Sequence, residues 1–218
     1  MAHLAYQPSI LDDLGLDGAM SGPAASIGPL AGHVRRQVLT RGAWVDHLPG
    51  WVQGSDAVLE VLLGDIGWRA DRRQMYEREV AVPRLLRWYG GGESLPHPLL
   101  TDARDELNRH YGPELGEQFV SAGMCLYRDG RDSVAWHGDR LGRGRSADTM
   151  VAIVSFGSPR PLMLRPVAGG RSLRFPLGHG DLVVMGGSCQ RTWEHCIPKT
   201  TKPVGPRVSV QFRPSGVA

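Results

Sequence analysis

Three residues in the C-terminal half of the chain have the types and spacing of a metal site. His137 and Asp139 lie two residues apart in a segment with strand character, so both side chains point to the same face. They could hold one metal ion together if His195 supplied a third ligand. Two histidines and one carboxylate, with the opposite side open, are typical of non-haem Fe(II) and its oxygen chemistry. Zinc is the main competing metal, because the same three ligands also suit it.

The segment 207–213 alternates between polar and apolar residues. The polar residues are Arg207, Ser209, Gln211 and Arg213, and the apolar residues between them are Val208, Val210 and Phe212. A surface strand with two exposed arginines would show this alternation. So would a strand that lines the mouth of a barrel, with both arginines binding a small carboxylate and the apolar face packed under helices. The metal triad favours the second interpretation, and zinc alone would not explain a neighbouring site for a dicarboxylate.

The elements that must position these residues follow a simple order, with helices first and short strands afterwards. A helix is predicted to begin at Ser55, capped by Ser55 or Asp56, and to stop at Gly64, and a second is predicted over 101–111, ended by Gly112-Pro113. Strands are predicted over 119–126, 133–137, 150–156, 161–165, 172–176, 181–185 and 207–213. This order predicts an α+β fold with a jelly-roll or β-sandwich core, buttressed by N-terminal helices.

Composition sets the outer limits of the interpretation. The 218 residues, 41% of them hydrophobic, suffice for one well-buried domain. The net charge of +3 is too small to demand nucleic acid, but arginines far outnumber lysines and favour an anionic partner. Cys125, Cys189 and Cys196 form no CxxC pair and leave one cysteine over, so a reducing cytoplasm fits best. No apolar run approaches membrane-spanning length, and the N-terminus does not have the pattern of a signal peptide.

From residue 83 onward the chain contains a series of motifs in a fixed order. They are Pro83-Arg84, Trp88-Tyr89-Gly90, CLYRDGRDSVAWHGD, VSFGSPRPLMLR, GDLVVMGGSCQRTWEHCIPK and RVSVQFR. Together they resemble the AlkB family of Fe(II)- and 2-oxoglutarate-dependent dioxygenases, and the resemblance extends weakly upstream. It implies a double-stranded β-helix of the jelly-roll kind, with an N-terminal extension that forms a lid over nucleic acid. This expectation agrees with the order of helices and strands.

The resemblance implies roles for five residues of the metal and cosubstrate sites. His137, Asp139 and His195 match the iron ligands. Arg207 and Arg213 match the arginines that hold the carboxylates of 2-oxoglutarate. The implied reaction uses Fe(II), 2-oxoglutarate and O2 to hydroxylate an N-alkyl carbon of a damaged base, and it releases an aldehyde, succinate and CO2.

Three further residues are expected to line the 2-oxoglutarate pocket. Tyr127 matches a tyrosine that hydrogen-bonds the cosubstrate, and Ser209 shares the polar face of the last predicted strand with the two arginines. Cys125 stands where family members commonly have asparagine. Because cysteine is the poorer hydrogen-bonding partner, we expect cosubstrate binding to depend more on Tyr127 and the arginines.

Family members act on single strands or flip the nucleotide out, because a base inside a duplex cannot reach a buried iron. Arg140, Arg143 and Arg145 follow the metal motif and are expected to contact phosphates, although a solvated loop would have the same composition. A second cluster of arginines between residues 69 and 87 could serve in the same way, or could belong to a solvated helix face.

The lid segment departs from the family pattern. Tyr89 and His97 are the residues expected to contact the base, and His97 is the stacking ring that the segment 91–97 offers in place of the usual lid aromatic. Arg140 and Leu141 stand where the family often has further acidic residues that address the base. The reaction type is therefore better specified than the lesion.

These observations predict a dioxygenase that dealkylates N-alkylated bases in single- or double-stranded DNA. Two alternatives remain open, namely the same chemistry on RNA, protein or a small molecule, and a nucleic-acid-binding module with a degenerate site. We expect an N-terminal arm over 1–40, partly disordered, an extension with helices and a nucleotide-recognition lid over 41–115, and the jelly roll over 116–218. Residues 41–218 would form one catalytic domain, monomeric and without contact to a membrane.

Overall fold

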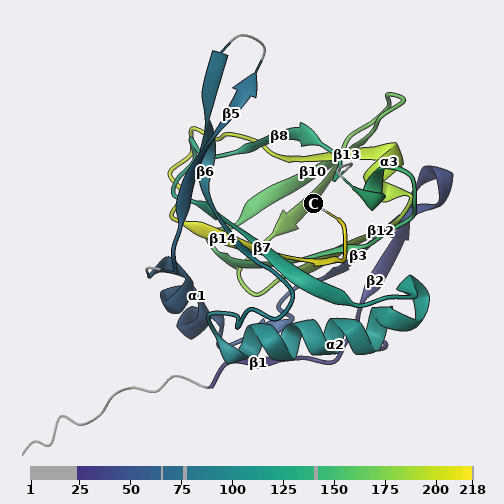
Figure 1. Ribbon diagram of the computed structural model, residues 1–218, viewed down its shortest axis with the longest axis horizontal. Coiled ribbons are helices and arrows are strands. Elements are labelled where there is room, and N and C mark those ends of the chain that lie inside the picture. Colours follow the sequence, from purple (N-terminus) through teal and green to yellow (C-terminus); the bar gives the residue numbers. More distant parts are fainter. Residues whose placement is uncertain (1–23, 65, 76–77, 140–141, 218) are drawn as a thin grey trace, which may run out of the picture.

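The computed structural model describes residues 24–64, 66–75, 78–139 and 142–217. Two β-sheets face one another, and two helices, α1 (Ser55–Leu63) and α2 (Pro98–Leu115), lie against the outer side of the larger sheet (Figure 1). This arrangement confirms the predicted jelly-roll core with buttressing helices. None of the helices in the described ranges has the length and apolar character needed to cross a membrane.

The larger sheet has eight antiparallel strands in the order β2-β3-β12-β9-β14-β7-β6-β5. Its members are β2 (Arg35–Val38), β3 (Ala43–Leu48), β5 (Arg69–Met75), β6 (Arg78–Tyr89), β7 (Phe119–Tyr127), β9 (Val151–Gly157), β12 (Leu182–Gly187) and β14 (Arg207–Pro214). The four strands that follow residue 116 form the middle of this sheet, and two strands from before residue 116 flank them on each side, so both parts of the chain build one body. The boundary between 115 and 116 stays a prediction.

The smaller sheet has four strands in the order β11-β10-β13-β8. They are β8 (Val134–His137), β10 (Arg160–Pro166), β11 (Leu173–Leu177) and β13 (Trp193–Ile197). A separate pair joins β1 (Ser26–Ile27) to β4 (Val52–Gln53), and the short helices are η2 (Thr40–Gly42), η3 (Arg143–Arg145) and α3 (Cys189–Thr192). The arm predicted over 1–40 lies partly outside the described residues, and its described part carries β1 and β2.

The outer side of the larger sheet buries the apolar face of β14. Val208, Val210 and Phe212 are fully buried in one cluster with Leu62 of α1 and Leu107 of α2. Burial of side chains of this size stabilises a fold by about 1.5–3 kcal/mol each. The arginines on the other face of β14 are also buried, so the interpretation of this segment as an exposed surface strand is wrong.

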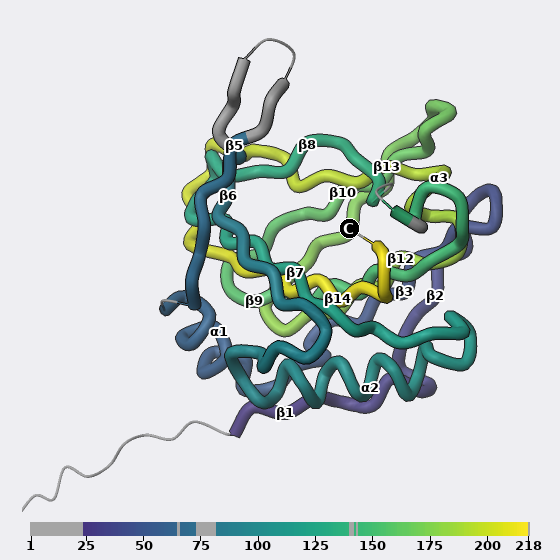
Figure 2. Tube along the Cα trace, viewed as in Figure 1, coloured from purple at the N-terminus to yellow at the C-terminus, as the bar shows by residue number. Residues whose placement is uncertain are grey.

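A second apolar cluster fills part of the space between the two sheets. It includes Ile153 and Met185 from the larger sheet and Leu164 and Phe175 from the smaller one. Strands β7 and β14 run side by side next to this cluster (Figure 2). Their inward residues include polar and charged side chains, which line a cavity beside the apolar cluster.

The second helix is longer than the sequence predicts. It begins at Pro98, after His97, whose Nδ1 accepts a hydrogen bond of 3.1 Å from the backbone N–H of Leu99. It also continues past Gly112-Pro113 and ends before Gly116, which has the left-handed φ of 74° that glycine adopts without strain. The first helix has the predicted bounds, although its N-cap is Gly54 rather than Ser55 or Asp56.

Several strands have no clear pattern in the sequence. β5 and β6 form an antiparallel hairpin where the sequence allows a helix face, and the segment RADRRQM of β5 shows no apolar alternation. β3 and β13 were also not predicted, and β13 carries the third metal-ligand candidate. The seven strands that the sequence predicts are all present, with ends shifted by one or two residues.

A polar network ties α2 to the edge of the larger sheet. Arg36 of β2 donates from Nε and Nη2 to Asp46, each at 2.9 Å, and from Nη1 to Glu114 of α2 at 2.9 Å. The hydroxyl of Tyr111 donates to Asp46 at 3.0 Å, and burial together with the Asp46 charge raises the pKa of that phenol far above its usual value. The Arg36 guanidinium lies 3.6 Å from the ring centroid of Trp44. These contacts fix β2, β3 and α2 to one another.

We expect Gly186→Ala to destabilise the fold. Gly186 pairs with Trp44 across β12 and β3, and a Cβ atom there would overlap the Trp44 indole. The resulting overpacking should lower the free energy of unfolding by about 1–3 kcal/mol, measured by urea denaturation. Gly112→Ala is the matched control, because the nearest atom to a Cβ lies 3.9 Å away and alanine favours a helix. That variant should be at least as stable as the native protein, and equal stability of the Gly186 variant would contradict the packing argument.

Candidate metal centre and cosubstrate pocket

The predicted metal ligands come together on the inner side of the smaller sheet. His137 at the end of β8 pairs directly with His195 of β13, and Asp139 follows β8 after one glycine. Their ligand atoms all lie within 4.8 Å of one another, with His137 Nε2 at 3.6 Å from Asp139 Oδ1. Two imidazoles and a carboxylate at this separation match the donor set of a facial triad.

Hydrogen bonds orient two of the three ligands. His137 Nδ1 lies 2.9 Å from the Ala135 carbonyl oxygen, which leaves Nε2 for a metal. The backbone N–H of Asp139 donates to Gln190 Oε1 at 3.1 Å, and Arg213 donates to Asp139 Oδ2 from Nε at 3.2 Å and from Nη2 at 3.0 Å. Asp139 Oδ1 is thereby left on the side of His137. Such secondary contacts are typical of metal sites, where they hold the ligands in position.

The electrostatics of the site keep two of the three ligands in metal-binding form at neutral pH. Burial alone would raise the pKa of Asp139, but the positive charges of Arg213, His195 and His137 lower it to about 2. Burial and the neighbouring His137 lower the pKa of His195 to about 3. A metal requires an ionised carboxylate and a neutral imidazole, and the protein environment favours these states at Asp139 and His195.

A cavity of about 1100 Å³ lies between the two sheets, and the three ligands line it. The wall formed by the larger sheet is arranged in cross-strand rows. Tyr127 lies opposite Arg207, Cys125 opposite Ser209, and Gly123 opposite Gln211. Partners in an antiparallel pair point to the same face. The cosubstrate-site residues that the sequence predicts on β7 and β14 therefore face the metal ligands across one cavity.

Arg207 is a buried cation that lacks a counter-charge within the described residues. Its side chain is 1% exposed, Nη2 donates to Ser155 Oγ at 2.8 Å, and Nε and Nη1 are buried without a hydrogen-bond partner. Burial disfavours the charged form of the guanidinium and therefore lowers its pKa. An isolated buried charge is costly unless an anion pairs with it. The side chain therefore fits a small carboxylate bound in the cavity.

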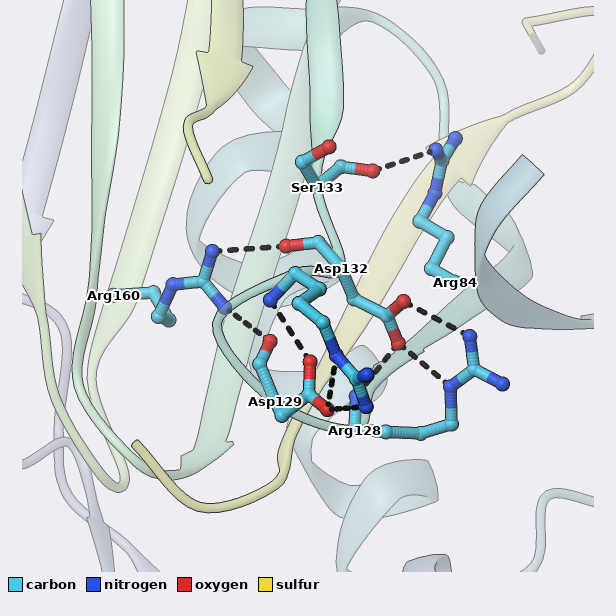
Figure 3. Close-up of polar contacts among 7 residues, drawn as sticks. Arg84, Arg128, Asp129, Asp132, Ser133 and Arg160 are labelled. Carbon is cyan, nitrogen blue, oxygen red and sulfur yellow. Dashed lines mark hydrogen bonds and ion pairs between the residues drawn. The ribbon is translucent and has the colours of Figure 1, made fainter. Parts of the chain in front are cut away.

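Arg160 is a second buried arginine, and both of its terminal nitrogens have backbone partners, although its Nε has none. It is 2% exposed and donates to the carbonyl oxygens of Asp129, Asp132 and Pro198 at 3.0, 2.9 and 2.6 Å. Figure 3 shows this guanidinium against the loop that joins β7 to β8. Arg84 of β6 holds the same loop through the Ser133 carbonyl oxygen at 3.2 Å (Figure 3). The loop thus fixes β8, which carries His137, relative to the end of β7 at Tyr127.

Gln211 is a cavity residue to which the sequence analysis assigned no role. Its Nε2 donates to Ser209 Oγ at 3.1 Å and lies 3.4 Å from Cys125 Sγ, and its Oε1 accepts from Arg213 Nη2 at 2.7 Å. Gln211 thus connects Arg213, which orients Asp139, with Ser209 and Cys125 on the cavity wall. Its place on the polar face of the alternating segment was the pattern that could have identified it.

The residues that the sequence analysis expects to contact the substrate do not lie together in the structure. Arg140 lies outside the described residues, Arg143 begins the short helix η3, and Arg145 is exposed at its end. Tyr89 is 6% exposed and belongs to the cluster beneath the helices, while His97 caps α2. The cavity lining includes neither Tyr89, His97 nor Arg145, but it does include Trp88.

Comparisons with known proteins identify the class to which this fold and site belong. The sequence profile of the 2OG-Fe(II) oxygenase superfamily matches residues 59–213. In the solved structure of a Pseudomonas putida prolyl-4-hydroxylase, the similarity covers 79% of this chain and 93% of the other, with a TM-score of 0.53 and 17% identity. That likeness concerns the fold alone.

Two human proteins are similar in sequence. Alpha-ketoglutarate-dependent dioxygenase alkB homolog 3 is 33% identical over 190 residues, which cover 76% of this chain and 64% of that protein. DNA oxidative demethylase ALKBH2 is 28% identical over 158 residues, which cover 65% of this chain and 60% of that protein. The chain thus spans under two thirds of the length of these relatives. It belongs to the 2OG-Fe(II) oxygenase superfamily. Fe(II), 2-oxoglutarate and O2 are accordingly its cofactor and cosubstrates.

His137→Ala should abolish tight metal binding. A triad without one imidazole is expected to lose more than about 100-fold in Fe(II) affinity, measured by anaerobic calorimetry. The fold should survive, because the His137 side chain is 38% exposed. His33→Ala, at an exposed histidine outside the site, is the matched control and should bind Fe(II) normally. Unchanged affinity in the His137 variant would contradict its assignment as a ligand.

Proposed function

We propose that the protein is an Fe(II)- and 2-oxoglutarate-dependent dioxygenase that removes alkyl groups from N-alkylated nucleobases in DNA. The observation that carries this proposal is the position of Arg207, whose Nε and Nη1 are buried without a hydrogen-bond partner, in the same cavity as the His137, Asp139 and His195 ligands. A metal site alone fits many enzymes. A metal site that shares its cavity with a buried, uncompensated arginine fits one that binds a carboxylate cosubstrate beside the metal.

When bound, Fe(II) together with 2-oxoglutarate and O2 supplies the oxidising chemistry that hydroxylates a C–H bond. The chain's own residues provide the geometry for it. Arg207 would pair with a cosubstrate carboxylate, with Tyr127 beside it, since the guanidinium carbon lies 5.2 Å from the Tyr127 ring centroid. Arg213 would hold Asp139 in place while it faces the same pocket. Hydroxylation of an N-alkyl carbon yields a product that releases an aldehyde and restores the base.

A nucleic-acid substrate is supported by the residues around the cavity and by the relatives. Arg69, Arg87 and Lys199 line the cavity together with Trp88, and cations and aromatic rings suit phosphates and bases. The name DNA oxidative demethylase, given to ALKBH2, favours DNA over RNA, protein or a small molecule. A monomer in a reducing cytoplasm is also part of the proposal, and the three buried cysteines without disulfides support the reducing compartment.

The dealkylation proposal predicts formaldehyde release from N-methylated oligonucleotides. With Fe(II) and 2-oxoglutarate, succinate and formaldehyde should form in equal amounts on methylated single-stranded DNA. Duplex DNA and RNA of the same sequence are the comparisons, and unmethylated DNA is the control. Succinate without formaldehyde on every oligonucleotide would reject base dealkylation but keep an oxygenase. No succinate and no binding of 2-oxoglutarate would instead favour a nucleic-acid-binding module with a degenerate site.

Arg207→Met should weaken 2-oxoglutarate binding without lowering the stability of the protein. Loss of a buried charged partner costs about 2–5 kcal/mol, so the KM for 2-oxoglutarate should rise about 30-fold or more. The protein without cosubstrate should be no less stable and is expected to melt at a higher temperature, because an uncompensated buried charge has been removed.

Arg174→Met, at an exposed arginine of β11, is the control for the loss of one positive charge. It should change neither the KM for 2-oxoglutarate nor the melting temperature appreciably. An Arg207 variant with normal 2-oxoglutarate kinetics and weakened DNA binding would make Arg207 a phosphate contact instead.

A further inference from the structure

Arg213 contacts the Asp139 ligand from one side, because two of its nitrogens donate to the same carboxylate oxygen. Nε lies 3.2 Å and Nη2 3.0 Å from Oδ2. An arginine and a carboxylate frequently form a fork instead, in which two nitrogens donate in parallel to the two oxygens. The other oxygen, Oδ1, lies 3.6 Å from His137 Nε2. The one-sided contact therefore leaves Oδ1 on the side of the other metal ligands.

A fork between these two residues would compete with a metal ion. The side chains of Arg213 and Asp139 are 9% and 5% exposed, so solvent screens their charges poorly. A hydrogen bond from the guanidinium to Oδ1 would set a positive charge against the oxygen that a cation needs. The metal site thus requires an arginine that holds the carboxylate without enclosing it.

Gln211 limits how Arg213 can donate. Its Oε1 accepts from Arg213 Nη2 at 2.7 Å, and the same nitrogen donates to Asp139. Nη2 carries two hydrogens, so both are used. Rotation of the guanidinium toward Oδ1 would break the contact with Gln211, which is shorter than either contact with Asp139.

The orientation of the Gln211 amide follows from its neighbours. Arginine offers donors and no acceptor, so the amide must turn its oxygen toward Arg213. Nε2 then points to Ser209 Oγ at 3.1 Å and to Cys125 Sγ at 3.4 Å, and both atoms can accept a hydrogen bond. A flipped amide would set its NH2 group against the guanidinium. Ser209 and Cys125 therefore hold Gln211 in the orientation that binds Arg213.

The register of the larger sheet brings these groups together. Gln211 and Arg213 are two residues apart on β14 and share its cavity face. Gly123 of β7 lies opposite Gln211 and pairs on its other side with Trp88 of β6. A Cβ atom at residue 123 would lie 2.8 Å from Arg213 Nη1 and 3.3 Å from the Trp88 ring, so the bare glycine gives the guanidinium its space. The sheet itself thus sets the position of the guanidinium.

We propose that Gln211 is a positioning residue that keeps Arg213 in one-sided contact with Asp139 and so reserves Oδ1 for the iron. It acts through Arg213 and is not itself a ligand. The inference rests on the Fe(II)-binding part of the proposed function and is independent of the substrate. Ser209 and Cys125 then serve the metal ligand through Gln211, in addition to any contact with 2-oxoglutarate.

Gln211→Leu tests the proposal by removing the acceptor while keeping most of the side-chain volume. The guanidinium should then close into a fork, and the Kd for Fe(II) should rise about 10- to 100-fold, measured by anaerobic calorimetry without cosubstrate. Gln211→Glu retains an acceptor for Arg213 and should keep the Fe(II) affinity near the native value. Gln37→Leu, at an exposed glutamine of β2 in the same sheet, is the matched control and should bind Fe(II) normally.

An Arg213→Lys background separates this role from a general effect on packing. A lysine ammonium keeps a positive charge beside Asp139 but cannot form a fork. In that background Gln211→Leu should therefore leave the Kd for Fe(II) unchanged. Equal losses in the native and the Arg213→Lys backgrounds would overturn the proposal. An unchanged Fe(II) affinity in the Gln211→Leu single variant would overturn it as well.

Two further measurements exclude a loss of fold or of the cosubstrate site. Without metal, Gln211→Leu should melt close to the native temperature, because its side chain is only half-buried, and Gln211→Met repeats the test with an unbranched chain of similar length. At saturating Fe(II), 2-oxoglutarate should bind almost as in the native protein, since Arg207 is intact. A loss confined to 2-oxoglutarate, with native Fe(II) affinity, would make Gln211 a cosubstrate residue and reject the positioning role.

These outcomes are distinct from failure of the proposed function. If the native protein binds Fe(II) and the Gln211→Leu variant binds it equally well, the positioning role fails and the oxygenase assignment stands. If the native protein binds no Fe(II), the metal assignment fails and the inference fails with it.

Discussion

The two chemically opposite faces of β14 are the constraint on which the rest of the structure depends. Successive residues of a strand point to opposite sides, so this strand serves two environments at once. Val208, Val210 and Phe212 complete the core under the helices, and Arg207, Ser209, Gln211 and Arg213 form the cavity wall. A register shift of one residue would bury the arginines among leucines and remove the wall. The register that stabilises the fold is therefore also the one that assembles the site.

The charges of the site are unequally compensated. Arg213 is paired with Asp139, and this pair orients the carboxylate at the metal position. Arg207 has no counter-charge among the described residues, and two of its nitrogens are buried without a hydrogen-bond partner. Buried Arg160, in contrast, donates to three carbonyl oxygens of the loops around it. The three buried arginines thus differ in their partners, and their sequence positions do not reveal this difference.

Much of this centre could be predicted from the sequence because its chemistry leaves local patterns. The spacing of His137 and Asp139 indicated a shared face, and the alternation at 207–213 indicated a strand with two environments. The hairpin of β5 and β6 could not be predicted, because its first strand is dominated by charged residues and gains its order from pairing. The same holds for the role of His97, since a histidine that caps a helix looks in sequence like any other polar ring. Trp88 was visible as part of a motif, but only the glycine across the strand pair shows where its ring lies.

The two edge strands of the larger sheet carry arginines, which affect how the sheet edges can meet another chain. β2 and β5 are the edges, and their sequences, RRQV and RADRRQM, carry closely spaced positive charges. An edge strand offers unpaired backbone groups to which another chain could add a strand, and charge at the edge opposes such growth. Arg36 is paired with Asp46 and Glu114, whereas Arg35 of β2 and Arg69 of β5 are exposed. Exposed arginines at both edges would oppose the edge-to-edge approach of a second copy.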